Sequence, residues 1–64
     1  MTPLQKTCLC IDNIILDNYE FIKRHEYQVD IYPLFYKIYN DGGWENYVFI
    51  EGEDNFNKNF KLID

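Results

Sequence analysis

The chain has 64 residues, of which 11 are acidic and 6 are basic, and its formal net charge at pH 7 is −5. A chain of this length forms one domain and buries only about 60% of the surface that its unfolded form exposes. It has six Tyr, five Phe and one Trp. Such rings fill a small core and leave no volume for a deep substrate cavity. The sequence also has no serine to act as a nucleophile. We therefore expect a single domain over residues 1–64 that is not an enzyme and holds no cofactor.

The first third of the chain predicts one strand followed by a long excursion. Residues 7–11 are mostly apolar or β-branched, which favours a strand, and the Asp-Asn pair at residues 12–13 is a turn signal that ends it. The apolar run at residues 14–16 belongs to the excursion, and residues 17–18 turn the chain again. Phe21 is then expected to enter the core.

The middle of the chain carries the clearest strand signal. Apolar and polar side chains alternate over residues 27–31, which predicts a half-buried strand. Residues 33–34 break that strand, and residues 35–39 predict the next one. The Asp-Gly pair at residues 41–42 is a hairpin signal because glycine accepts a positive φ. Residues 44–50 are expected to form the return strand.

The last third predicts one helical turn and a closing strand. Asp54 is expected to cap the turn through its carboxylate. Phe56 and Phe60 are four residues apart, which places both rings on one face, and residues 61–63 form the last strand. Five short strands with one helical turn indicate an all-β fold, a small five-stranded barrel. The expected core consists of Phe21, Tyr27, Val29, Ile31, Phe56 and Phe60.

Cys8 and Cys10 alternate within the first predicted strand and therefore share one face, where they lie about 6.5–7 Å apart. This spacing does not readily allow a disulfide, so we expect two reduced thiols, at least one of them buried. A zinc site needs four ligands and only His25 is available to join the thiols, so we expect no metal site. Nothing in the sequence brings His25 to either thiol, and a thiol within a strand lacks the helix N-terminus or cation that would lower its pKa, so we also expect no catalytic residue. The sequence has no run of about 18–20 apolar residues and no secretory signal. Together with the reduced thiols, these features favour a cytosolic protein without a membrane partner.

The excess negative charge lies in one stretch, residues 41–54, which has five acids and no Lys or Arg, whereas the other six acids balance the six bases. Such a surface repels a phosphate backbone, and residues 23–24 are the only basic pair, so direct nucleic-acid binding is not expected. The stretch also contains the single tryptophan, a residue type that often dominates interface energies. The predicted partner-binding residues are Asp41, Trp44, Glu45, Glu51, Glu53 and Asp54.

Two interpretations of the tryptophan stay open. Trp44 either joins Tyr32, Tyr39 and Tyr47 in an exposed aromatic patch beside the acids, or it covers one end of the barrel. Residues 51–55 are interpreted as a solvated turn, because they lack the alternating Asp positions and the distal Glu of a calcium loop.

The order of these elements resembles the small SH3-like barrel proteins found in phages and prophages of low-GC Gram-positive bacteria. The matching positions are Cys10-Ile11, Phe21, Lys23, Glu26-Tyr27-Gln28-Val29, Asp41-Gly42, Phe56 and Phe60-Lys61-Leu62-Ile63. They are core and turn positions, which specify a fold rather than a site. Arg24 departs from the pattern, because these proteins usually carry glycine there. Either the turn has another geometry, or Arg24 adopts a positive φ at a cost of about 1 kcal/mol.

The resemblance implies an SH3-like barrel that binds, and inhibits, a host protein in the bacterial cytosol. A defence nuclease, such as a CRISPR nuclease, is one such target. The acidic stretch suggests that mimicry of nucleic acid is the mechanism, because electrostatic complementarity guides such binding. The alternative function is that of a structural or nucleic-acid-associated module in a phage assembly. Homodimer formation also stays open.

Overall fold

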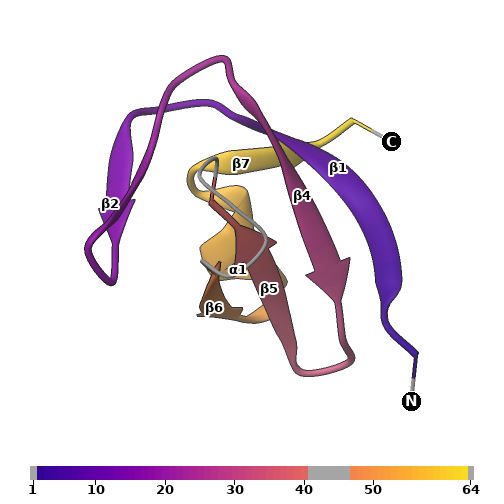
Figure 1. Cartoon of the computed structure of the whole chain (residues 1–64). Coiled ribbons are helices and arrows are strands. Elements are labelled where there is room, and N and C mark those ends of the chain that lie inside the picture. Colours follow the sequence, from indigo (N-terminus) through magenta and orange to yellow (C-terminus); the bar gives the residue numbers. More distant parts are fainter. Residues whose placement is uncertain (1, 41–46, 64) are drawn as a thin grey trace.

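The computed structural model describes residues 2–40 and 47–63 (Figure 1). Within these ranges the chain is mostly strand, with one short helix. The elements are β1 (Leu4–Cys10), β2 (Ile14–Leu16), β3 (Tyr19–Phe21), β4 (Glu26–Ile31), β5 (Phe35–Tyr39), β6 (Tyr47–Glu51), α1 (Gly52–Asn57) and β7 (Phe60–Leu62).

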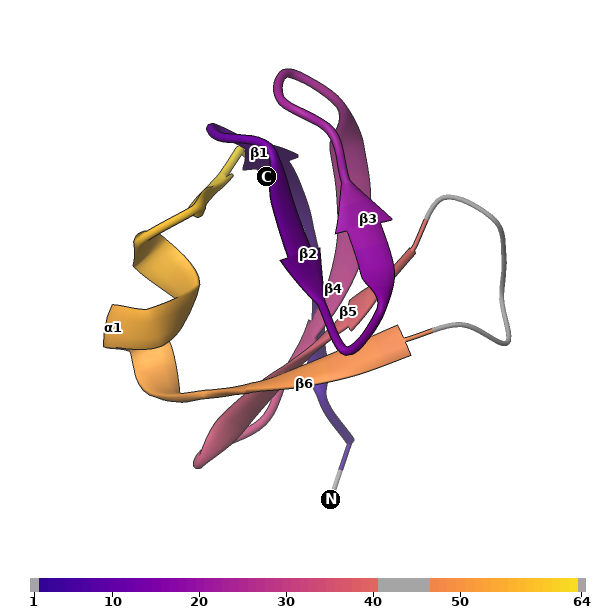
Figure 2. The same cartoon turned by 90° about the vertical axis from the view of Figure 1, so that its left-hand side faces the viewer.

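Five of the strands form one antiparallel sheet in the order β6-β5-β4-β1-β7, and β2 pairs with β3 in a separate two-stranded sheet. The large sheet curls into half a barrel, and Figure 2 shows the β2–β3 hairpin lying across its open side. The expected all-β architecture with one short helix is therefore confirmed.

The β2–β3 hairpin is a feature that the sequence prediction treated as an excursion without pairing. Its two-residue turn consists of Asp17 and Asn18, whose φ angles are 47° and 69°. Two consecutive residues with positive φ match the twist of the flanking strands, and short Asp and Asn side chains tolerate this region better than most. The turn was predicted correctly, and the pairing of the two short strands beside it was missed.

The prediction that Asp54 caps the helix is wrong. Helix α1 begins at Gly52 with Glu51 as its N-cap residue, which makes no capping bond through its side chain. Gly52 has a φ of +78°, a conformation that lets β6 turn directly into the helix and that glycine adopts without steric cost. Asp54 lies inside the first helical turn instead, where a negative charge favours the helix dipole.

The turn between β3 and β4 settles the geometry of Arg24. Its φ is 74°, so of the two alternatives that the sequence left open, the arginine adopts the positive φ. Its N–H donates a hydrogen bond of 2.7 Å to the C=O of Cys10, and the N–H of His25 donates to the C=O of Ile22 at 3.1 Å. These two bonds hold the strained residue in place.

Three phenylalanine rings form the centre of the core. Phe21 of β3 meets Phe60 of β7 edge-on, with ring centroids 5.4 Å apart. Phe60 stacks on Phe56 of α1, also at 5.4 Å, and Phe21 contacts Tyr27 edge-on at 4.9 Å. Five of the six predicted core residues are buried, and Ile31 is half-buried against them.

No helix in the described ranges is long and apolar enough to cross a membrane.

Replacing Phe21 by Ala is expected to unfold the domain. The ring is fully buried, so its removal costs about 3–5 kcal/mol. Small domains have a free energy of unfolding that begins at about 5 kcal/mol, so this loss removes most of the stability. Leu4→Ala is the matched control, because Leu4 is largely exposed. Thermal melts followed by circular dichroism measure the difference. A Phe21→Ala melt that is cooperative and close to that of the control would show that the ring does not hold the core together.

Candidate interaction surface

Strands β5 and β6 form a hairpin with one buried face and one outward face. Ile38, Val48 and Ile50 are buried, and because side chains alternate along a strand, the residues between them point away from the core. The outward residues are Phe35, Lys37 and Tyr39 on β5 and Tyr47, Phe49 and Glu51 on β6. The register places Lys37 opposite Phe49.

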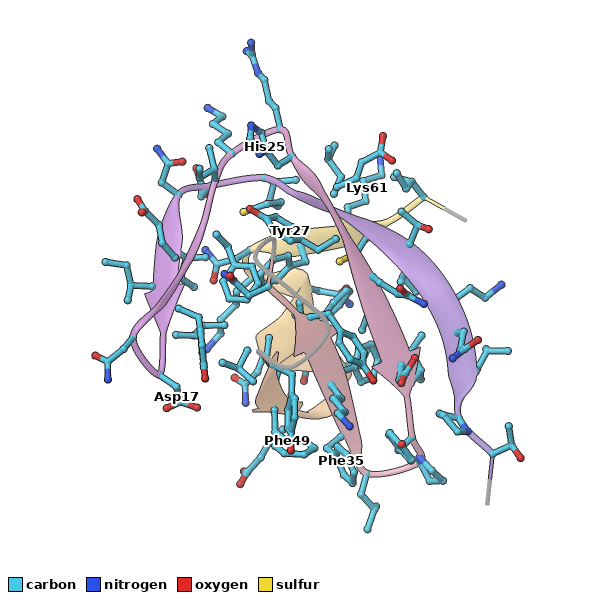
Figure 3. The ribbon with its side chains drawn as sticks, viewed as in Figure 1. Asp17, His25, Tyr27, Phe35, Phe49 and Lys61 are labelled. Atoms are coloured by element: carbon cyan, nitrogen blue, oxygen red, sulfur yellow. The ribbon has the colours of Figure 1, made fainter. Side chains whose placement is uncertain are left out.

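Five rings run in an unbroken series over this outward face. We call Tyr32, Phe35, Phe49, Tyr47 and Tyr39, in this order, the aromatic stripe. Successive ring centroids are 4.6, 5.1, 5.3 and 6.3 Å apart, within the range in which aromatic pairs attract one another. Figure 3 shows Phe35 and Phe49 together at the lower margin of the molecule, on the side opposite to His25.

The rings of the aromatic stripe lie outside the core and are partly exposed to solvent. Phe49 is 53% exposed and Tyr47 is 40% exposed, while Leu34, which precedes Phe35 in the chain, is 84% exposed. None of the five rings is among the buried residues of the core. Contiguous exposed apolar side chains with polar neighbours are typical of surfaces that bind another molecule.

Lys37 crosses the stripe with its charged end over two of the rings. Its Nζ lies 4.2 Å from the ring centroid of Tyr47 and 5.5 Å from that of Tyr39. A cation within about 6 Å of a ring centroid is attracted by the electrons of the ring face. The lysine therefore links the tyrosines of β5 and β6 and places a positive charge over the end of the stripe that these two rings form.

Asp30 of β4 is hydrogen-bonded to the tyrosine at one end of the stripe. It lies opposite Lys37 in the register of β4 and β5 and is only 5% exposed. Its Oδ2 accepts a hydrogen bond of 2.9 Å from the hydroxyl of Tyr39, and its Oδ1 has no partner among the described residues. The hydrogen bond to Asp30, followed by burial, raises the pKa of Tyr39, because both favour the neutral hydroxyl.

Three of the six predicted site residues lie beside the aromatic stripe in sequence and are exposed. Glu51 ends β6, and Glu53 and Asp54 follow in the first turn of α1. The other three predicted residues, Asp41, Trp44 and Glu45, lie outside the described residues.

The charge of Glu53 acts on a neighbouring tyrosine. Burial raises the pKa of Tyr36, and the negative charge of Glu53 raises it further.

Tyr32, Tyr39 and Tyr47, the tyrosines of one of the two interpretations of Trp44, all belong to the aromatic stripe, whereas Trp44 itself lies outside the described residues, so the choice between the two interpretations stays open. Phe35 and Phe49, the rings that join these tyrosines, were not among the predicted residues. Their signal was the alternation itself, because odd-numbered residues of β5 and β6 point outward wherever the even-numbered ones are buried.

The two thiols lie in the core and not at this surface. Cys8 and Cys10 are free and fully buried. Burial raises the pKa of Cys8 to about 12 and also raises that of Cys10. A thiol is a nucleophile only as its thiolate, so this environment suppresses thiol chemistry. The described residues contain no group of three or more side chains suited to a metal ion.

Comparisons of the chain with models of protein families, with curated proteins and with solved structures find no match.

Tyr39→Phe is expected to destabilise the domain by about 1–3 kcal/mol, because it leaves the buried Asp30 carboxylate with no hydrogen bond. Tyr47→Phe is the matched control, since Tyr47 has a similar ring in a more exposed position. The contribution of the Tyr39 hydroxyl is present below the ordinary tyrosine pKa of about 10 and is lost as the pH rises through its raised pKa. Urea titrations at pH 7 compare the variants; equal midpoints would contradict the role of this hydrogen bond.

Both thiols are expected to be inert towards a disulfide reagent at pH 8 in the native protein. Full burial denies the reagent access, and the pKa of about 12 leaves almost no thiolate on Cys8 at this pH. In urea, two thiols react per chain. Rapid reaction of either thiol under native conditions would show that the barrel opens at β1.

Proposed function

We propose that the chain is a small interaction protein that binds another protein through the outward face of β5 and β6. The aromatic stripe supplies the apolar centre of the interface, and Glu51, Glu53 and Asp54 supply a negative rim. The partner is a protein that presents a basic surface with an apolar recess.

The observation that carries this proposal is the exposure of Tyr47 and Phe49 within a series of rings in mutual contact. A domain this small has few apolar side chains with which to fill its core, and yet five rings lie outside the core on one face. Aromatic side chains have few rotamers to lose, so they gain much contact area at a small entropic cost when a partner covers them. Residues of this kind are enriched among those that dominate interface energies.

Electrostatics support a basic partner. The chain carries a net charge of −5, and the exposed Glu51, Glu53 and Asp54 follow the stripe residue Phe49 closely in sequence, at the end of β6 and in the first turn of α1. Such charges speed association with a positive surface and make its rate depend on salt. Lys37 lies within the stripe, where it contacts two tyrosine rings, and it would face an acceptor on the partner.

The order of elements supports a finer assignment within this proposal. A first strand, a hairpin excursion, three consecutive antiparallel strands, a helical turn and a closing strand fit an SH3-like barrel of the kind that phages and prophages carry. On this basis the partner is a host protein of the bacterial cytosol whose activity the chain inhibits. A nuclease of a defence system is one such partner, with the acids taking the place of nucleic-acid phosphates.

The second candidate function is that of a module in a phage assembly. The same stripe supports it, because an assembly contact also covers exposed rings. Affinity purification of the tagged chain from a low-GC Gram-positive host distinguishes the two: the proposal expects a host protein, and the alternative expects phage structural proteins or nucleic acid.

Reversing two acids tests the electrostatic part of the proposal with the purified partner. The double variant Glu51→Lys, Glu53→Lys is expected to slow association and to flatten its dependence on salt, because both charges lie on the rim. The double variant Asp12→Lys, Glu26→Lys is the control, since it changes the net charge equally at exposed positions elsewhere. Stopped-flow or surface plasmon resonance gives the rates. Equal slowing by both pairs would mean that only the net charge matters.

Removing one ring tests the aromatic part. Phe49→Ala is expected to speed dissociation at least tenfold while the fold is kept, because the ring is outside the core. Trp44→Ala is expected to act in the same direction if the tryptophan belongs to the interface, and Leu4→Ala serves as an exposed apolar control. Binding of the Phe49→Ala and Trp44→Ala variants at the rates of the parent would place the interface on another surface, with Lys23 and Arg24 as the next candidates.

A further inference from the structure

In the described part of the chain strand β6 lies at a free edge of the large sheet, and the turn before β5 shows which of its backbone groups point to that edge. The N–H of Tyr32 donates to the C=O of Phe35 at 2.9 Å, so the backbone groups of Phe35 face β4. The N–H and C=O of one strand residue point to the same side, and this side alternates along the strand. Tyr36 and Ile38 therefore face β6.

The register carries this alternation across to β6. Tyr36 and Ile38 pair with Ile50 and Val48, which consequently use their backbone groups on β5. The backbone groups of the remaining three residues point to the free edge. These residues are Tyr47, Phe49 and Glu51.

The side chain of Asn55 agrees with this assignment, because its Nδ2 donates a hydrogen bond of 2.8 Å to the C=O of Glu51. The N–H and C=O groups of Tyr47 and Phe49 and the N–H of Glu51 stay at the edge. No backbone hydrogen bond joins them to another part of the described chain.

The edge also lacks the features that usually protect one. Natural edge strands carry lysine, proline or a bulge to prevent pairing with another chain. Strand β6 reads Tyr-Val-Phe-Ile-Glu, with β-forming residues on both faces and its single charge at the last position. Its five residues pair with β5 in an uninterrupted register. Within β6, therefore, no lysine, proline or bulge opposes pairing with another strand.

A cavity of about 280 Å³ lies beside this edge, between β6 and the β2–β3 hairpin. In Figure 2 the hairpin lies above β6, with α1 at the far end. The residues that line the cavity are Ile14, Leu16, Phe49, Ile50, Asn55, Lys58, Asn59 and Phe60. The lining is apolar on the two strand sides and polar next to α1.

We propose that β6 accepts an extended segment of a partner protein as an added strand, which lies between β6 and β2. The inference rests on the proposed function in that the chain binds a protein. The free groups of Tyr47, Phe49 and Glu51 bond to the backbone of the segment, as in other cases of strand addition. Alternate side chains of the segment enter the cavity, and the others lie on the outward face beside the aromatic stripe.

The occupant is a single extended segment, because β2 lies on its far side and leaves no room for a second strand of the partner. The cavity is bounded by β6 on one side and by Ile14 and Leu16 of β2 on the other. The β6 strand of a second copy is attached to its own β5, and its Val48 and Ile50 are buried in its own core. That strand therefore has no side chain to place in the cavity. A flexible tail or loop with β-branched or other apolar residues at alternate positions fits.

The test begins with random heptapeptides displayed on phage and selected against the intact chain. A selected peptide is synthesised and titrated into labelled protein, with the amide signals of Tyr47, Phe49 and Ile15 followed by NMR. We expect alternating apolar residues in the peptide and the largest shifts at these amides. N-methylation at one residue is expected to weaken binding at least tenfold, while N-methylation at the next residue changes it less than threefold, because only alternate N–H groups face β6.

Matched variants test the protein side. Phe49→Pro and Phe49→Thr both remove the ring, but only the proline removes the N–H at the edge, where proline breaks no bond to β5. We expect at least tenfold weaker peptide binding for Phe49→Pro than for Phe49→Thr. Lys58→Trp narrows the cavity and is expected to weaken binding likewise, whereas Lys61→Trp, on the opposite edge strand, is the control. If Phe49→Pro unfolds, the N-methyl pair and the Lys58 variant decide.

Three results would overturn the inference. The selection returns no peptide that binds the purified chain; the peptide shifts amides elsewhere and its N-methyl scan shows no alternation; or the Phe49→Thr chain is dimeric and Phe49→Pro monomeric in sedimentation, which would assign the edge to a second copy. The proposed function fails separately. It fails if the physiological partner binds the Phe49→Ala, Trp44→Ala and acid-reversal variants like the parent, whatever the peptides do.

Discussion

The edge-to-face contact between Phe21 and Phe60 is the interaction on which the rest of the fold depends. Phe21 ends the β2–β3 hairpin, and Phe60 begins the last strand, so one contact joins a separate two-stranded sheet to the edge of the large sheet. Phe60 also stacks on Phe56 and thereby fixes α1. In a domain of this size no second core is available to share that function.

The sequence predicted those parts of the fold in which local pattern and tertiary burial agree. The alternation of residues 27–31 and the continuous strand at residues 35–39 were found because each buries alternate side chains in the large sheet. The β2–β3 pairing was missed because three-residue strands are too short to show a period. The helix start was misplaced for a different reason: Gly52 supplies a positive φ that ends β6, and backbone geometry of this kind overrides the capping preference of Asp54.

The candidate surface was predicted in part for the same physical reason. Tyr32, Tyr39 and Tyr47 entered one of the two interpretations of Trp44, as members of an exposed patch beside the acids. Phe35 and Phe49 did not, because composition alone places phenylalanine in a core. The parity of each strand decides between these outcomes: the even-numbered residues of β5 and β6 face inward, and a ring at an odd position therefore faces solvent whatever its hydropathy.

The contact between Asp30 and Tyr39 has an evolutionary consequence. The carboxylate is buried in the outward face of β4 and depends on the Tyr39 hydroxyl for its hydrogen bond, while the ring of that tyrosine is one end of the aromatic stripe. Loss of either residue leaves the other in an unfavourable environment, so the two positions are expected to change together during descent. A lineage that replaces Asp30 with an apolar residue becomes free to replace Tyr39 as well, so a change at one buried position alters which ring ends the aromatic stripe.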